Sequence, residues 1–226
     1  LRGFDVARTE TTVGQFRRFV EATKTRTQAE STGGGEVYES GWVRKAGWTW
    51  RTPFGQNHSA GEDEPAVHLT FNEAQAFCRW AGGALPTDAQ WLSAAYTEQR
   101  TVPAAPFERG RSYLFPTGHL PDGAQCLVEC GPESKVRAVK HGAPLERGDG
   151  PARVRQTRAG VNGLYDMGGN VWEWVDEPAG ADALVARRTR GGSWWYGAAA
   201  MRADYLQSKS PDTAVVYIGF RCVGSH

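Results

Sequence analysis

Cysteine and histidine are the residues of this chain that could carry out redox or metal chemistry. The 226 residues include four cysteines and five histidines. Cys126 and Cys130 could form half of a zinc site, but no second pair follows at a spacing typical of zinc ligands. The histidines form no HxxxH or HxxE pattern, and neither a Ser-His-Asp order nor a glycine-rich phosphate loop stands out. We therefore interpret Cys126 and Cys130 as buried or paired thiols.

The last quarter of the chain alternates between two kinds of sequence. Three blocks rich in glycine and tryptophan, GLYDMGGNVWEW (163–174), RGGSW (190–194) and IGFRC (218–222), enclose residues 195–217. The enclosed insert mixes small, aromatic, charged and branched residues without a helical or strand period. A rigid frame around an irregular insert predicts a site that is presented on loops.

Composition excludes several classes of protein. With 26 basic and 25 acidic residues the formal net charge is +1, which argues against a nucleic-acid-binding protein. No apolar run is long enough to span a bilayer. A length of 226 residues fits one large domain or two small ones, and we expect residues 1–226 to be a single domain. Because the first methionine is Met167, we expect this domain to be the C-terminal part of a longer polypeptide. Nine tryptophans and 28 glycines predict a compact fold with little regular secondary structure.

Three helices are predicted from the same start signal. A threonine stands three residues before a glutamine or glutamate at Thr12, Thr70 and Thr87, which is the spacing of a capping box. An apolar face follows each threonine, and Gly82-Gly83 is expected to end the second helix. A short strand is expected before the first helix.

The remaining segments show weaker patterns. Residues 24–66 are predicted to be loops with at most short strands, with Trp42, Trp48 and Trp50 packed against the core. No period persists through 98–160, where proline and glycine recur.

Five separated blocks together resemble the formylglycine-generating-enzyme (sulfatase-modifying factor) family. They are ETTVGQFRRFVEAT, FNEAQAFCRWAGGALPTDAQWLSAAY, GLYDMGGNVWEW, RGGSW and IGFRC, and they occur in the order of the family. The resemblance implies a variant of the C-type lectin fold. We therefore expect an α+β domain with small antiparallel sheets, two or three helices and much irregular structure.

The resemblance also bears on activity. The oxidases of the family bind copper with two cysteines just after the GGS motif, whereas residues 194–201 of this chain contain no cysteine. We therefore predict that the chain is not an enzyme and uses no cofactor for chemistry. The alternatives are an oxidoreductase of another branch, or an accessory or sensor domain of a larger enzyme.

Two structural features are implied by the same resemblance. Cys78 and Cys222 match positions that form a disulfide in secreted members, and two buried thiols are the alternative. A calcium site would use the side chains of Asp166 and Glu173 and the carbonyl oxygens of Gly169 and Val171. In the alternative, Asp166 and Glu173 only hydrogen-bond the turn and nearby N–H groups.

The chain is also similar to the variable proteins of diversity-generating retroelements, which bind ligands and share this fold. In these proteins the region between the GGSW and GFR blocks is rewritten by mutation at adenines, and here that region is 195–217. A randomised asparagine codon yields Tyr, Ser, Gly, Ala, Val, Thr or Asp, and no asparagine follows Asn170. The candidate ligand-binding positions compatible with such codons are Tyr196, Gly197, Ala199, Ala200, Asp204, Tyr205, Ser208, Ser210, Thr213, Val215, Val216 and Tyr217.

The other residues and the physical properties of the insert refine this hypothesis. Trp195, Met201, Gln207 and Lys209 do not fit such codons, and they would be fixed or come from other codons. Tyrosine and serine are favoured in binding loops, so we expect an exposed site for a protein or cell-surface ligand. In the alternative, Tyr205 and residues 215–217 form a strand and pack inside, since the run from Val215 to Ile218 is strand-like. A sugar ligand is disfavoured because the chain contains no EPN or QPD motif.

Overall fold

The computed structural model describes residues 3–139, 145–178 and 186–225. Its three longest helices begin where the sequence predicted them: α1 (Val13–Thr23), α3 (Phe71–Trp80) and α4 (Asp88–Tyr96). In each, the threonine hydroxyl accepts a hydrogen bond from the N–H three residues on, and that residue's side chain accepts one from the threonine N–H. The capping boxes therefore fix the starts of all three helices.

Two short helices lie in segments that the sequence predicted to be irregular. Helix α2 (Gln28–Ser31) begins with a fourth capping box, formed by Thr27 and Glu30, and α5 is Glu133–Arg137. Single 3₁₀ turns occur at η1 (Val161–Gly163) and η2 (Ala198–Met201).

The strands form three small sheets. Strands β1 (Phe4–Val6) and β8 (Val223–Ser225) pair antiparallel, as do β2 (Glu36–Tyr38) and β3 (Trp42–Arg44). The third sheet has the order β6-β5-β4-β7. Its strands are β4 (Trp172–Pro178), β5 (Arg187–Arg190), β6 (Gln207–Lys209) and β7 (Ile218–Gly219). Only β4 and β7 run parallel among the described strands, with Trp172 opposite Ile218. The architecture is thus the predicted α+β type with one parallel pair added.

Tryptophan and phenylalanine side chains fill the main core. Trp48 and Trp50 are buried in it, as predicted. Trp42 is 47% exposed, and the prediction that it packs against the core is wrong. It stands at the start of β3 opposite Tyr38, and the two rings meet edge-on at a centroid distance of 5.4 Å on the surface.

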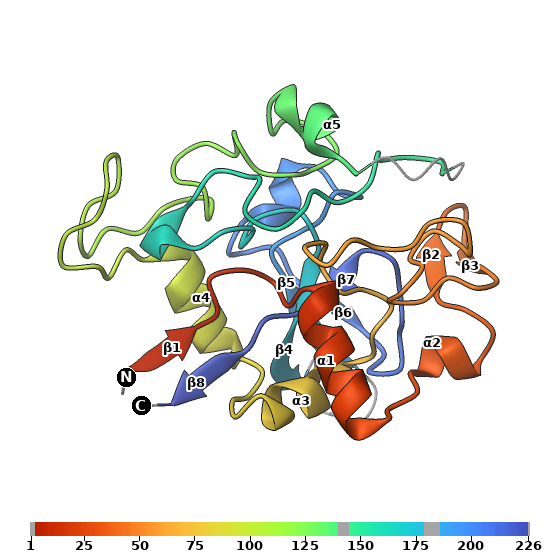
Figure 1. The fold of residues 1–226 in the computed structure, drawn as a ribbon. Helices are drawn as coiled ribbons and strands as arrows, with labels where there is room; N and C mark the ends of the chain where they lie inside the picture. The colour runs from red at the N-terminus through yellow and green to blue at the C-terminus, as the bar shows by residue number, and fades with distance from the viewer. Residues whose placement is uncertain (1–2, 140–144, 179–185, 226) are drawn as a thin grey trace.

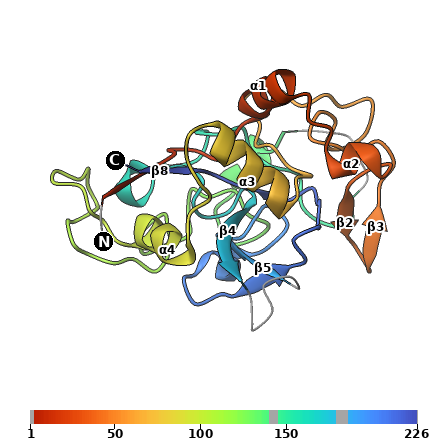
Figure 2. The same cartoon turned by 90° about the horizontal axis from the view of Figure 1, so that it is seen from below.

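The four-stranded sheet lies centrally, with α1, α3 and α4 around it (Figures 1 and 2). In both views the β2–β3 hairpin lies at the opposite end of the molecule from β1 and β8. Among the described residues, no helix combines the length and the apolar character needed to cross a bilayer.

Candidate functional site

The three glycine- and tryptophan-rich blocks bind one another through the backbone. The Gly169 N–H donates to the Gly191 oxygen (2.8 Å), and the Trp194 N–H donates to the Asn170 oxygen (2.8 Å). Strand β7 from the third block pairs with β4 from the first. The blocks therefore form one frame, which holds both ends of the insert 195–217.

Two residues of the first block allow this close approach. Gly169 has φ +75°, and a Cβ there would lie 2.4 Å from the Gln125 oxygen, so only glycine fits. Asn170 has φ +58° and is fully buried. Its amide donates to Glu10 Oε2 (2.7 Å) and its Oδ1 accepts from the Ala152 N–H (2.8 Å). The turn is thus fixed by side-chain hydrogen bonds to distant segments.

Beneath the frame lies a buried ionic cluster. The Arg221 guanidinium donates to both oxygens of Glu173, with contacts of 2.7 and 2.8 Å, and to the carbonyl oxygens of Ala7 and Tyr165. Glu10 is buried nearby and accepts from the Val171 N–H. Burial raises the pKa of Glu10 well above its usual value, and the charges of neighbouring carboxylates raise it further.

The residues predicted to bind calcium do not fit such a site. Both oxygens of Glu173 are taken by the Arg221 guanidinium, and Oε2 also accepts from Trp91 Nε1 (2.7 Å). The carboxylate of Asp166 accepts from the Thr157 hydroxyl and the Arg155 N–H. A cation at Glu173 would have to displace a buried arginine. These side chains instead tie the turn to its surroundings, and the described residues contain no cluster of three His, Cys, Asp or Glu side chains suited to a metal ion.

The two ends of the insert are buried and stack on each other. The Trp195 and Tyr217 rings lie nearly parallel, with centroids 5.9 Å apart. Tyr217 also meets Tyr196 edge-on at 5.8 Å. The His68 N–H donates to the Val215 oxygen (3.1 Å). The insert therefore leaves and re-enters the core at neighbouring points.

The middle of the insert, residues 202–213, faces solvent. Of the twelve predicted positions, five are exposed and three half-buried: Ala199, Asp204, Tyr205, Ser208 and Ser210, then Tyr196, Gly197 and Thr213. The other four, Ala200, Val215, Val216 and Tyr217, are buried, so the prediction that they contact a ligand fails. Val215–Tyr217 belong to the main core and do not form a strand, since β7 begins only at Ile218.

An arginine outside the insert positions this exposed segment. Arg190, at the end of β5, donates to the carbonyl oxygens of Ala203 (2.9 Å) and Tyr205 (3.1 Å). The same guanidinium is paired with Asp88 at the start of α4 (2.6 and 2.7 Å). Burial alone would raise the pKa of Asp88, but hydrogen bonds and charge from Arg190 and Arg188 lower it below its usual value. The carboxylate thus stays ionised and holds the arginine beneath the insert.

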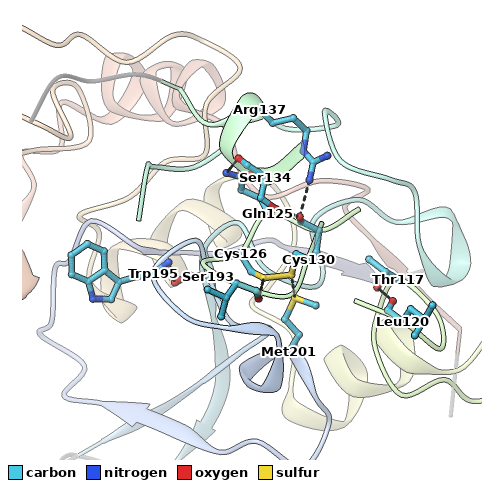
Figure 3. Close-up of a disulfide and its surroundings, with 12 residues drawn as sticks. Thr117, Leu120, Gln125, Cys126, Cys130, Ser134, Arg137, Ser193, Trp195 and Met201 are labelled. Atoms are coloured by element: carbon cyan, nitrogen blue, oxygen red, sulfur yellow. Dashed lines mark hydrogen bonds between the residues drawn. A yellow bond between two sulfur atoms is a disulfide. The ribbon is translucent and has the colours of Figure 1, made fainter. Parts of the chain in front are cut away.

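All four cysteines are paired, so the chain has no free thiol. Cys78 is joined to Cys222, the pairing that the family resemblance implied, and Cys126 is joined to Cys130. The second disulfide lies against Met201, whose Sδ is 3.9 Å from Cys130 Sγ (Figure 3). The segment 126–130 is also bound to the insert, because the Leu127 N–H donates to the Tyr196 oxygen (2.9 Å). The stretch 194–201 therefore contains a thioether, Met201, and the disulfide packed against it is an oxidised pair.

A pocket of about 270 Å³ lies beside this disulfide. It is lined by Cys126, Leu127, Val128, Gly148, Asp149 and Trp194, among others. None of the residues that line this pocket belongs to the insert 195–217.

Sequence reasoning missed several residues next to the insert. Trp42 and Tyr38 on the β2–β3 hairpin lie beside it, and the Lys209 ammonium lies 5.9 Å from the centre of the Trp42 ring. Arg147 lies over the Trp195 and Tyr196 rings, at 5.1 and 5.5 Å. No signal within 24–66 or 98–160 indicated these contacts, because they join segments far apart in the sequence.

The family described as sulfatase-modifying factor enzyme 1-like domain matches residues 1–226. Among curated proteins, the chain is 29% identical to the formylglycine-generating enzyme of Streptomyces coelicolor, covering 98% of this chain and 78% of that protein. It is 32% identical to the inactive C-alpha-formylglycine-generating enzyme 2 of Mus musculus, covering 93% and 71%. The family thus includes relatives named as enzymes and relatives named as inactive.

Solved structures share the fold at low identity. PvdO from Pseudomonas aeruginosa superposes with a TM-score of 0.64 at 17% identity, over 97% of this chain and 79% of PvdO. Treponema denticola variable protein 1 superposes with a TM-score of 0.55 at 17% identity, over 99% and 84%. The fold is the C-type lectin-like fold of the formylglycine-generating-enzyme type, and the chain belongs to the sulfatase-modifying factor enzyme 1-like domain family.

Proposed function

We propose that this chain is a non-enzymatic ligand-binding protein, the variable protein of a diversity-generating retroelement, and that it binds a protein or cell-surface ligand. The observation that carries the proposal is the exposed segment 202–213, whose two ends are fixed in a rigid frame. The ligand-binding positions are the eight predicted residues that reach the surface: Tyr196, Gly197, Ala199, Asp204, Tyr205, Ser208, Ser210 and Thr213.

Three further observations support the proposal. Residues 194–201 contain no cysteine, and every cysteine of the chain is in a disulfide. A relative that is 32% identical carries the name of an inactive enzyme. The fold is compatible with this role because a protein named variable protein 1 also has it.

The source DNA tests the proposal directly. We expect a near-copy of the codons for residues 190–222 close to the gene, differing mainly at adenines, and a reverse transcriptase gene beside it. A sequenced locus with neither element would contradict the proposal. A locus with the near-copy but with changes spread over all four bases would contradict the retroelement mechanism.

An oxidoreductase of another branch is the second candidate. The observation in its favour is the Cys126–Cys130 disulfide beside the pocket of about 270 Å³. The test is to incubate the reduced protein with copper or iron and a thiol-containing peptide, and to follow oxygen consumption and peptide mass. Metal-dependent oxidation that is lost in a Cys126→Ala/Cys130→Ala variant would replace the first proposal. No turnover above the rate of free metal is the expected result.

A further inference from the structure

A continuous strip of aromatic rings and cations runs along one edge of the insert. The strip comprises Tyr38, Trp42, Arg147, Tyr196, Gln207 and Lys209, which come from three separate segments. Tyr196 accepts a hydrogen bond from Gln207 Nε2 (3.0 Å), and Lys209 lies two residues further along β6. The contacts of Arg147 with Tyr196 and of Lys209 with Trp42 extend the strip at its two ends.

The hairpin end of the strip is fixed to the insert by the backbone. The Glu36 N–H donates to the Ala214 oxygen (2.8 Å), and the Val216 N–H donates to the Glu36 oxygen (3.0 Å). Trp42 and Tyr38 are 47% and 42% exposed, although both are large enough to contribute strongly to a core. The hairpin therefore presents a preformed pair of aromatic rings beside the insert, which is the kind of residue that dominates protein interfaces.

The two cations of the strip both contact aromatic rings. In the described part of the chain no ion pair involves Arg147 or Lys209, whereas Arg111 and Arg202 pair with Glu108 and Asp204. Burial lowers the pKa of Lys209 because it disfavours the charged ammonium. A carboxylate placed next to Lys209 would favour the charged form again. The charge of the strip is thus complementary to acidic groups.

Most residues of the strip are not among the candidate variable positions of the insert. Trp42, Tyr38 and Arg147 lie outside 195–217, and neither Gln207 nor Lys209 fits a randomised asparagine codon. Only Tyr196 is among the candidate variable positions. Half of the strip, Tyr38, Trp42 and Arg147, therefore lies outside the interval that would be rewritten.

We propose that this strip is a fixed anchor for a protein partner that presents carboxylate side chains next to an aromatic or aliphatic residue. This inference rests on the proposed ligand-binding function and adds the chemistry of the partner. Carboxylates pair with Arg147 and Lys209, and the apolar residue packs on Trp42 and Tyr38. The exposed positions of 202–213 then select among partners that share this acidic feature.

The test uses a displayed library of random 12-residue peptides, selected on the immobilised 226-residue chain. We expect enriched peptides to contain Asp or Glu together with an aromatic or aliphatic residue, and their binding to weaken as salt rises. For a selected peptide, Trp42→Ala and the double change Arg147→Gln/Lys209→Gln should each weaken binding about tenfold. Arg109→Gln, which removes an exposed charge outside the strip, is the control and should leave binding unchanged.

A second pair of variants separates this inference from the proposed function. If Tyr205→Ala and Ser208→Ala abolish peptide binding but the strip variants do not, the anchor is wrong and the variable site stands. If neither the strip variants nor the Tyr205 and Ser208 variants change binding, or if no peptide is enriched, the anchor and the proposed ligand-binding function are both wrong. Retention on heparin-agarose that depends on Arg147 and Lys209, without enrichment of acidic peptides, would assign the strip to a polysaccharide and overturn the inference. Circular dichroism melts that match the parent exclude unfolding as the cause, and Trp42→Phe should retain part of the affinity.

Discussion

The frame and the middle of the insert differ in burial and in the bonds that their side chains make, and these two properties decide how well a position tolerates substitution. Frame residues such as Asn170, Glu173 and Arg221 are fully buried, and each is bonded to segments far away in the sequence. Residues 202–213 are mostly exposed, and they are held largely through backbone atoms, by the bonds from Arg190 to the oxygens of Ala203 and Tyr205 and by the pairing of β6 with β5. Because those bonds use backbone atoms, the side chains there can change without breaking them. Stability and recognition are therefore placed on separate residues.

The largest loss of stability is expected when the long-range disulfide Cys78–Cys222 is removed. Cys78 and Cys222 are 144 residues apart, so the entropic model gives the bond about 5 kcal/mol, against about 2 kcal/mol for the five-residue loop of Cys126 and Cys130. We expect the double alanine variant of the first pair to lose the larger amount in urea unfolding. The double alanine variant of the second pair is the matched control. An equal loss for the two variants would show that loop length does not govern the difference.

The next effect comes from removing the buried cation of the frame. Arg221→Met leaves the Glu173 carboxylate buried without its partner, and we expect a loss of about 3–5 kcal/mol in the free energy of unfolding. Arg202→Gln also breaks an ion pair, but on the surface of the insert. Its denaturation midpoint should match that of the parent. A shift of similar size in both variants would remove the contrast between the frame and the insert.

Acid should reduce the free energy of unfolding through His68, which contacts the insert where it re-enters the core. Burial lowers the pKa of His68 from 6.5 to about 4, so the folded state keeps the ring neutral. As pH falls from 6.5 to 4, the unfolded chain takes up the proton first and stability is lost, by up to about 3 kcal/mol. Buried Glu10 and Asp166, whose pKa values are raised, act in the opposite direction. The measurement is therefore the difference in unfolding free energy between the parent and His68→Asn at pH 7 and pH 4, and a difference independent of pH would contradict the prediction.

The smallest effect on stability is expected for substitutions of exposed serines in the insert. Ser208→Ala and Ser210→Ala should change the free energy of unfolding by no more than about 0.5 kcal/mol, since both side chains face solvent. The same changes should alter affinity for peptides that contact the insert. Thermal melts and peptide titrations on the same preparations give both readouts. A drop in melting temperature of many degrees would mean that the middle of the insert supports the fold.

The helices were predictable because their signals are local. A threonine and an acceptor three residues later fix a helix start without help from the rest of the chain. The same signal at Thr27 and Glu30 was present and was missed, because α2 is a single turn and has no apolar face to extend the pattern. The frame was recognised from its blocks of sequence, yet its geometry depends on contacts such as that between Asn170 and Glu10, 160 residues apart.

The sequence predicted an exposed segment within the insert, but it could not tell which of the candidate residues reach the surface. Codon compatibility identifies positions that could vary, but it carries no information about burial, and Val215–Tyr217 pass that test while lying in the core. Trp42 shows the converse error. A tryptophan was expected inside because of its size, but Trp42 lies on a two-stranded hairpin, where its ring meets Tyr38 and Lys209 at the surface.

The stacking of Trp195 on Tyr217 has a consequence for the length of the insert. The two rings bring the ends of a long segment together in the folded state, so a longer middle would start and finish at the same two points. Loop-closure entropy grows only with the logarithm of loop length, and doubling the number of residues costs about 0.6 kcal/mol. The fold can therefore accept extra residues on either side of β6 at a cost comparable with that of losing a single buried methyl group.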